Sequence, residues 1–322
     1  MSFSWGSFAI SCLLVVFLVV YLHIVVYVRK DILCICAKFT SAAISLLLLR
    51  MLLPIHFPFA KTVNMEFLLS GTYWAFRSLE DFGKTLGEAL LWLWGAGVWT
   101  KLAFLIVSQI RFRCWLRPYV AAGSRLPREM QEILRECGEA GFRVAAYETL
   151  DPPSVVGLFR PVLILPLGNY TSTEMRYIFR HEIEHYKNGD LWRKALLDMV
   201  LCVQWFNPFA YTLRRELTLM YEMANDQRVI GSCGEVERRE YAECLLKIAR
   251  RVKTGRMKKR AASFVGARNA GLETRIQFIM EPMETQEAKR DGKWIDRLLN
   301  IALIVLLTAS FLIAPDPHGA RP

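Results

Sequence analysis

Several patterns are absent from the 322-residue sequence, and each absence removes a class of protein. There is no internal repeat and no low-complexity tract, which excludes a solenoid and a wholly disordered chain. No DNA-binding motif is recognisable, although the net charge is +11, so direct nucleic-acid binding is not expected. The Ser-x-x-Lys motif of penicillin-binding enzymes is missing. Histidine is scarce, with five in the whole chain, which limits the ligand sets that a metal site could use.

Hydrophobic residues, in contrast, are abundant. They make up 53% of the chain and the mean hydropathy is +0.24, too high for an ordinary soluble enzyme. The excess lies in four runs, at about residues 7–28, 34–53, 89–110 and 294–314. The first run has no formal charge and is long enough to cross a hydrocarbon core of ~30 Å at about 1.5 Å per residue. We therefore predict a multi-pass α-helical membrane protein with four spans.

The basic residues of the loops predict the orientation in the cell membrane. Arg29 and Lys30 follow the first span, and Arg111 and Arg113 follow the third, which places both points in the cytoplasm. Because the first pair follows its apolar run, that run is expected to be an uncleaved anchor rather than a signal peptide. The loop 54–86 is charge-balanced and is expected to be extracellular.

Residues 111–293 then form one large cytosolic domain, and residues 315–322 form a short extracellular tail. The domain carries most of the positive charge, which positive-inside bias and attraction to anionic lipid explain without nucleic acid. The eight cysteines fall in spans or on the cytoplasmic side, so no structural disulfide is expected.

The domain is predicted to be mainly α, or α+β, with a small sheet. An amphipathic helix is expected over 128–139, and the β-branched stretches 142–149 and 154–166 predict a strand pair or a short sheet. From residue 172 the pattern is helical, with Ser172 or Thr173 available as the N-cap.

The helix that begins there should end near Asn188 and Gly189, and Asp190 can cap the next one. The apolar half of that next helix is too short to span a bilayer and is broken at Asn207 and Pro208. It is expected to lie on the membrane or to dip into it.

The stretch RHEIEHYKNGD, residues 180–190, carries the chemistry. His181 and His185 are four residues apart, so on a helix both imidazoles can reach one cation. Glu182 lies about 100° round the helix and can reach a metal-activated water as a general base. The alternative interpretation is a charged surface helix.

A catalytic Zn²⁺ needs a third protein ligand, and no third histidine is available in the cytosolic domain. The downstream candidates are Asp190, Cys202, Glu216 and Glu222. We predict Glu222, because Asp226 follows one turn later on the same face and can accept a hydrogen bond from a ligating imidazole. Glu216 stays as the alternative ligand, and a solvated helix face is the alternative for the acidic pair.

These motifs, the flanking RHEIEHYKNGDLWRK, the WFNPFAY segment and the order of spans resemble the BlaR/MecR-type antirepressor membrane zinc peptidases. The likeness extends from residue 7 to about residue 314. The resemblance implies a gluzincin-like domain in which His181, His185 and Glu222 hold zinc. It also implies that Glu182 is the general base and that Asp226 orients a ligand.

The resemblance further implies a cytosolic substrate, a transcriptional repressor, and self-cleavage between the metal domain and the last span. The basic segment 253–271 is the matching place, with a lipid-facing loop as the alternative. The family's receptors continue into an extracellular penicillin-binding sensor, whereas eight residues follow the last span here. We expect a form without that sensor, which takes its signal through the loop 54–86, the spans or a separate partner.

Two other functions remain open from the sequence. One is a signalling scaffold that binds a repressor without catalysis, although a scaffold has no need of Glu182. The other is a membrane maturation or quality-control protease that uses the same site. Tyr211, Tyr221 and Tyr241 are candidate oxyanion donors or ordinary packing residues. A homodimer is also left open.

Overall fold

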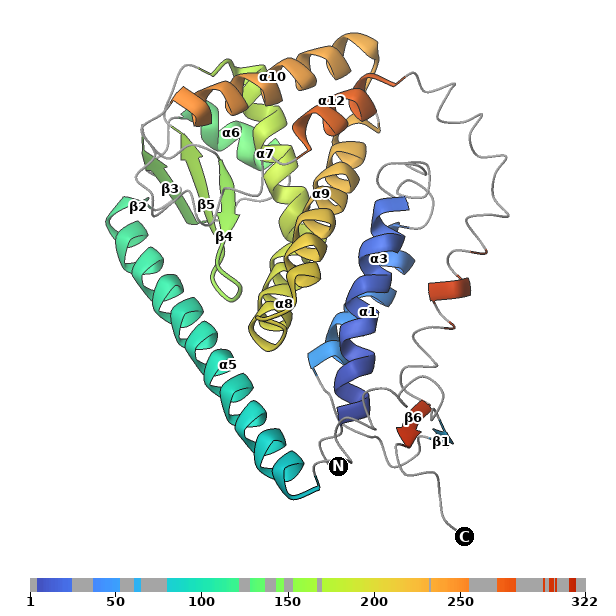
Figure 1. Ribbon diagram of the computed structural model, residues 1–322. Coiled ribbons are helices and arrows are strands. Elements are labelled where there is room, and N and C mark those ends of the chain that lie inside the picture. The colour runs from blue at the N-terminus through green and yellow to red at the C-terminus, as the bar shows by residue number, and fades with distance from the viewer. Residues whose placement is uncertain are drawn as a thin grey trace.

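A computed structural model describes most of the chain and shows a mainly helical molecule with a small sheet (Figure 1). The residues it describes are 5–24, 37–52, 61–64, 80–121, 128–136, 143–147, 153–166, 170–231, 233–254, 271–281, 298, 301–303, 305 and 313–316. The sheet and the helices α6, α7, α10 and α12 lie at one end, and α5, α1 and α3 extend away from it. The hairpin of α8 and α9 runs between α5 and the pair α1 and α3.

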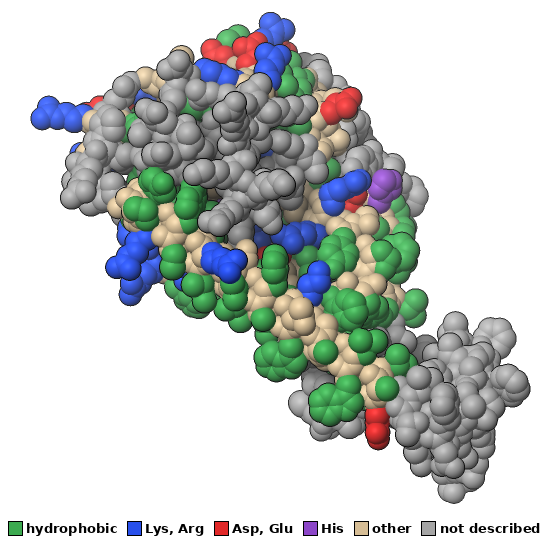
Figure 2. Space-filling view, turned by 60° about the vertical axis from the view of Figure 1, so that its left-hand side comes forward, with side chains coloured by type: hydrophobic (Ala, Val, Ile, Leu, Met, Phe, Trp, Pro, Cys, Tyr) green, Lys and Arg blue, Asp and Glu red, His purple; other side chains and the backbone are tan. Residues whose placement is uncertain are grey.

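The helix α5, Glu80–Leu116, is the longest element. The segment Glu88–Tyr119, which consists of most of α5 and the 3₁₀ turn that follows it, is long and apolar enough to cross a membrane, and among the described residues no other helix is. Large side chains such as Trp92, Trp99 and Phe104 are exposed along it, and Figure 2 shows this row of hydrophobic side chains. An exposed apolar surface of this length is typical of contact with lipid.

The other predicted spans are described less completely. The helices α1, Trp5–His23, and α3, Ala37–Leu52, contain shorter apolar stretches, Cys12–His23 and Ala43–Leu52. Most of the predicted span 294–314 lies outside the described residues. The four-span topology therefore stays a prediction.

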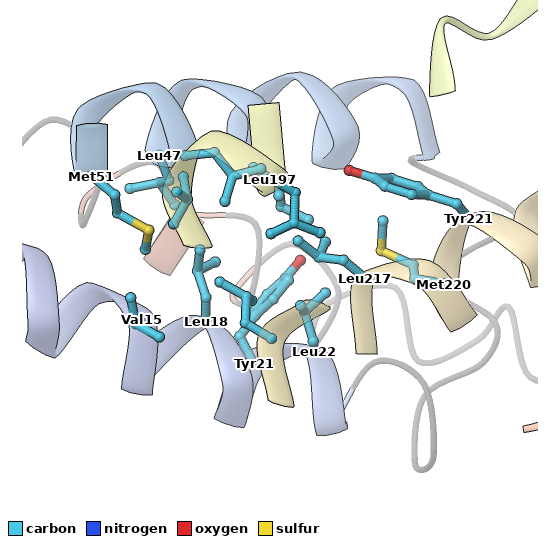
Figure 3. Close-up of a cluster of buried hydrophobic side chains, with 14 of the residues drawn as sticks. Val15, Leu18, Tyr21, Leu22, Leu47, Met51, Leu197, Leu217, Met220 and Tyr221 are labelled. Atoms are coloured by element: carbon cyan, nitrogen blue, oxygen red, sulfur yellow. The ribbon is translucent and has the colours of Figure 1, made fainter. Parts of the chain in front are cut away.

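The helices α8, Asp190–Val203, and α9, Pro208–Ile230, form a hairpin that packs against α1 and α3. Leu18 and Leu22 of α1 and Leu47 of α3 meet Leu197 of α8 and Leu217 of α9 in one buried cluster (Figure 3). The other side of α8 contacts α5. The apolar half of α8 is therefore enclosed by the helices that the sequence predicts as spans.

A four-stranded sheet confirms the small sheet expected from the sequence. Its order is β2-β3-β5-β4, with β2 at Val120–Ala121, β3 at Arg143–Tyr147, β5 at Val162–Pro166 and β4 at Ser154–Val156. The central pair β3 and β5 is parallel, and the outer strands β2 and β4 are each antiparallel to their neighbour. By the strand order, β4 is one edge of the sheet. The 3₁₀ turn η2, Arg117–Tyr119, joins α5 to β2.

The sheet packs on two helices, α6, Arg128–Glu136, and α7, Ser172–Lys187. Leu163 and Leu165 of β5 contact Ile178 and Phe179 of α7 in a second buried cluster. Burial of each such side chain contributes about 2 kcal/mol. This packing fixes α7, and with it the two histidines, against the sheet.

Two further strands lie far from that sheet. The strand β1, Lys61–Asn64, pairs in parallel with β6, Ile313–Asp316. The strand β1 lies in the loop 54–86 that the sequence predicts to be extracellular, whereas β6 covers the last two residues of the predicted span 294–314 and the first two of the predicted tail. Their pairing brings residues more than 200 positions apart to one end of the molecule.

The helix ends near the histidines differ in detail from the sequence expectation. The N-cap of α7 is Thr171, not Ser172 or Thr173, because Thr171 and Glu174 have the spacing of a capping box. The Thr171 hydroxyl accepts from the Glu174 N–H, and the Glu174 carboxylate accepts from the Thr171 N–H at 2.8 Å.

The start of α8 also differs. Its N-cap is Gly189, with φ of 72°, and Asp190 is the first helical residue rather than the cap. The Asp190 side chain turns instead toward His185. The predicted end of α7 is confirmed, since Asn188 is its C-cap.

Two helices complete the domain behind α7 and α9. The helix α10, Glu235–Thr254, packs on α7, and α12, Leu272–Met280, packs on α9 and α10. Tyr241 of α10 and Phe278 and Ile279 of α12 are fully buried. Both helices therefore place side chains in the interior close to the histidines.

Candidate metal centre

Two packed helices bring three candidate ligands together. His181 and His185 lie on the buried face of α7, and Glu222 lies on the facing side of α9; their exposed fractions are 5%, 4% and 1%. One ligand atom from each side chain lies within 4.8 Å of the other two. The Nε2 atoms of both histidines are 3.3 Å from a Glu222 oxygen, His181 from Oε2 and His185 from Oε1.

The outer nitrogen of His185 is held by Asp190. Its Nδ1 lies 2.7 Å from Asp190 Oδ2, which also accepts from Asn225, while Oδ1 accepts from Arg193. Burial works against an ionised Asp190, but the hydrogen bond with His185 lowers the pKa of Asp190 below its usual value. Because a carboxylate only accepts, His185 carries its proton on Nδ1 and presents a lone pair at Nε2.

The outer nitrogen of His181 is held by Tyr241. The Tyr241 hydroxyl lies 2.9 Å from His181 Nδ1 and 2.6 Å from Asp226 Oδ1. Burial, and then the charge of Asp226, raises the pKa of Tyr241 well above its usual value, so the hydroxyl keeps its proton. That proton points to Asp226, and the hydroxyl oxygen accepts from His181 Nδ1–H. His181 then also presents a lone pair at Nε2.

When both rings are neutral, the inner face of the group therefore consists of acceptors only. Two imidazole lone pairs and a carboxylate point at one another in a buried space, an arrangement that repels unless a cation or a proton lies between them. Within the described residues, His185 Nε2 has no hydrogen-bond partner. Burial lowers the pKa of His181, which favours the neutral ring that metal ligation requires. Burial opposes the charged form of His185 as well, but the charge of Glu222 raises the pKa of His185, so in the absence of an ion a proton on this ring is favoured. Two nitrogens and one carboxylate are the protein donors of many catalytic zinc sites, so the residues fit this ion.

Glu182 lies beside this group without belonging to it. It follows His181 on α7, is almost fully buried, and its Oε2 accepts a hydrogen bond of 3.1 Å from the N–H of Val155 in the edge strand β4. The strand thus holds a carboxylate next to the two histidines. Such a group can take up and release a proton at the site.

Arg275 contacts two acidic residues of α9, and the sequence interpretation did not include it. Its Nε and Nη2 donate to Asp226 at 2.7 and 2.8 Å, and its Nη1 lies 3.2 Å from Glu222 Oε2. Burial opposes its charge, but the charges of Asp226 and Glu222 raise the pKa of Arg275, so it stays a cation. No local pattern indicates this, because Arg275 is 49 residues from Asp226 in the sequence.

The alternative ligands lie elsewhere. Glu216 is buried on α9, but its Oε1 lies 3.6 Å from Arg215 and it does not join the histidines. Cys202 is near the far end of α8. Asp190 contacts the outer nitrogen of His185 and so supports a ligand, a role that its position just after the helix stop could have suggested. In the described part of the chain, His181, His185 and Glu222 are the one group of three that could hold a metal.

The three tyrosines that the sequence offers as candidate oxyanion donors lie in different parts of the structure. Tyr211 donates to the carbonyl of Trp205 at the far end of the hairpin, and Tyr221 packs in the core near α1 and α3. Only Tyr241 contacts the group, and its proton is directed to Asp226. Asp226 therefore reaches His181 mainly through Tyr241, since its direct distance to Nδ1 is 3.4 Å.

Comparisons with known proteins give the chain a family and several relatives. The family model described as BlaR1 peptidase M56 matches residues 56–279. The regulatory protein BlaR1 of Bacillus licheniformis is 23% identical over 175 residues, which are 52% of this chain and 29% of that protein. The methicillin resistance mecR1 protein of Staphylococcus aureus is 27% identical over 133 residues, 40% of this chain and 23% of that protein. The matched region thus spans less than a third of the length of each relative.

Proposed function

Because the chain belongs to the BlaR1 peptidase M56 family, we propose that it is a membrane-bound zinc endopeptidase that hydrolyses a peptide bond in a cytosolic regulator. One observation carries the proposal. The Nε2 atoms of His181 and His185 and the carboxylate of Glu222 converge in a buried space lined by acceptors. In this proposal, these three side chains hold the zinc ion.

In the proposed reaction, the zinc ion supplies Lewis acidity and the side chains of the protein transfer protons and orient the ligands. Zinc held by two histidines and a glutamate supplies a Lewis acid that lowers the pKa of a water molecule and polarises a peptide carbonyl. Glu182 acts as the general base: it accepts a proton from the attacking water as the C–O bond forms. It then delivers that proton to the amine nitrogen as the C–N bond breaks. The hydrogen bond from Val155 holds the Glu182 carboxylate in place for both transfers.

The remaining polar residues orient the ligands. Asp190 holds the ring of His185 through Nδ1, and Tyr241 with Asp226 does the same for His181. Each contact selects the tautomer that leaves Nε2 available to the metal. These residues need not touch the substrate to affect the reaction.

The regulator is proposed to be a transcriptional repressor. The support is the similarity to proteins named for regulation and for methicillin resistance. Self-cleavage within 253–271 is a further proposed reaction of the same site; of that segment, only 253, 254 and 271 are among the described residues. We also propose four spans with the metal centre in the cytoplasm, and the exposed apolar surface of α5 supports the membrane location.

The variant Glu182→Gln tests the catalytic role. The full chain, in vesicles that also carry the membrane proteins of the same cells, is incubated with zinc and a mixture of cytosolic proteins, and new amino termini are identified by mass spectrometry. We expect the wild-type chain to cleave a repressor and Glu182→Gln to do so at least about 100-fold more slowly, with its zinc content unchanged. Glu243→Gln, an exposed glutamate on α10, serves as the matched control and should behave as wild type.

Two outcomes would contradict the proposal. Cleavage by Glu182→Gln at the wild-type rate would show that the chain acts as a scaffold or that another group is the base. New termini confined to membrane proteins, with none in a repressor, would instead indicate a maturation or quality-control protease.

A further inference from the structure

We propose that Arg275 is a positioning residue of the metal centre, which orients two of the three zinc ligands through one buried guanidinium. The inference rests on the proposed function, because it presumes that His181, His185 and Glu222 bind zinc. It adds a residue from α12 that neither the motifs nor the ligand group includes.

The contacts use the fork of the guanidinium. Two of its nitrogens donate to the two oxygens of Asp226 at 2.7 and 2.8 Å, and the third lies 3.2 Å from Glu222 Oε2. Such a bidentate pair restricts the rotation of a carboxylate more than a single contact does. A lysine ammonium could supply the charge at this place but not the planar fork.

The charges of the site explain why a cation is needed there. Glu222 and Asp226 lie one turn apart on α9, and both are almost completely buried. Two carboxylates that close repel each other, and a buried charge without a counter-ion is costly. Lys194 lies 3.7 Å from Glu222 Oε1, but it is partly exposed, whereas Arg275 is only 3% exposed. Arg275 is therefore the buried counter-ion of the pair.

The two contacts act on different ligands. Arg275 holds Glu222 Oε2, which leaves Oε1 on the side of His185 Nε2. It also holds Asp226, which accepts from Tyr241 and so orients His181. Without the guanidinium, the carboxylates of Glu222 and Asp226 would be free to rotate. The first is a proposed zinc ligand, and the second orients His181 through Tyr241. The expected result is weaker metal binding rather than a loss of chemistry alone.

The packing of α12 against α9 and α10 places Arg275 at this point. Gly271, the N-cap of α12, has φ of 78°, and a Cβ there would lie 2.5 Å from Leu219 of α9. A side chain at this position would be strained and would push the two helices apart. At the other end of α12, Arg238 of α10 donates to the carbonyl of Glu281 at 3.1 Å. Arg238 is a buried arginine that attaches α12 without touching the ligands, which makes it a matched control.

The test is the zinc dissociation constant of the full chain in lipid nanodiscs, measured by competition with a chelating fluorophore. For Arg275→Gln we expect zinc binding to weaken by about 10- to 100-fold. Arg275→Lys, which keeps the charge and protects the fold, should give an intermediate loss. Arg238→Gln should bind zinc as wild type does.

Each contrary result has a definite meaning. Equal or tighter zinc binding by Arg275→Gln would overturn the inference, as would wild-type affinity in Arg275→Lys if the glutamine variant does not fold. Equal losses in the Arg275 and Arg238 variants would show that only the docking of α12 matters. The variant His185→Ala distinguishes a failure of this inference from a failure of the proposed function. If His185→Ala also binds zinc normally, the proposed function fails. If His185→Ala loses zinc and the Arg275 variants do not, only the role of Arg275 fails.

Discussion

At the scale of single residues, the contacts of the imidazole Nδ1 atoms decide what the histidines can do. A free histidine can carry its proton on either nitrogen, and only the Nε2 lone pair faces the other ligands here. Asp190 and Tyr241 remove that choice at 2.7 and 2.9 Å. The spacing of the motif places the rings on one helix face, and these two contacts leave the Nε2 atoms of both rings available to one ion.

Tyr241→Phe should weaken zinc binding by about tenfold, because it removes the acceptor of His181 Nδ1–H and the donor to Asp226 while keeping the ring. The control is Tyr221→Phe: this tyrosine is also buried, and its hydroxyl has no hydrogen-bond partner among the described residues. Zinc affinity measured by chelator competition distinguishes the two variants. If both bind zinc equally well, Tyr241 does not orient His181.

At the scale of elements, the hairpin of α8 and α9 connects the metal centre to the membrane-length helix. The end of the hairpin next to the candidate metal centre contains Asp190 and Glu222. The opposite end, around residues 203–211, is hydrogen-bonded to α5. The Trp94 indole donates to the carbonyl of Val203 at 2.9 Å, and the Trp205 indole donates to that of Trp94 at 3.3 Å.

Lys101 strengthens the same connection. It lies in the apolar stretch of α5, where a lone ammonium is expensive, and its Nζ donates to the Tyr211 hydroxyl at 3.3 Å. Tyr211 in turn donates to the carbonyl of Trp205 at 3.0 Å. This contact therefore favours the rotation of α5 about its axis in which Lys101 lies on the side of the hairpin.

Gly97→Leu should separate α5 from the hairpin, because a Cβ at Gly97 would lie 2.3 Å from the Trp205 ring. Overpacking of this kind costs about 1–3 kcal/mol, so we expect the thermal unfolding midpoint in nanodiscs to fall by several degrees. A Cβ at Gly95, two residues away on the same helix, would meet no atom within 4 Å, so Gly95→Leu should leave the midpoint unchanged. Equal midpoints for the two variants would argue against close packing of α5 on Trp205.

At the scale of the whole molecule, the proposed topology assigns the two ends of α5 to opposite sides of the membrane. The metal domain continues from the end at Leu116 and should be cytoplasmic, with the loop 54–86 outside. Cys114 lies exposed near the Leu116 end of the helix, the end that is proposed to be cytoplasmic. A native thiol is thus available to test the orientation.

A membrane-impermeant maleimide should not label Cys114 in intact cells, and it should label Cys114 once the membrane is permeabilised, since the reagent reaches only the outer face of a closed cell. A cysteine introduced by Ser70→Cys, in the loop 54–86, should be labelled in both conditions. The measurement is the mass of the labelled peptides. Labelling of Cys114 in intact cells would reverse the orientation and place the metal centre outside.

The sequence alone determined the features that depend on short-range periodicity and on composition. The pair His181 and His185, the end of their helix and the small sheet follow from local spacing, and the scarcity of histidine directed attention to Glu222. Only the tertiary structure decided the surroundings of the ligands. Tyr241 and Arg275 reach the site from α10 and α12, and Asp190 serves His185 instead of capping α8. Helical period specifies which residues share a face, but which faces meet depends on the packing of the whole chain, and that packing places the buried cation and the hydroxyl.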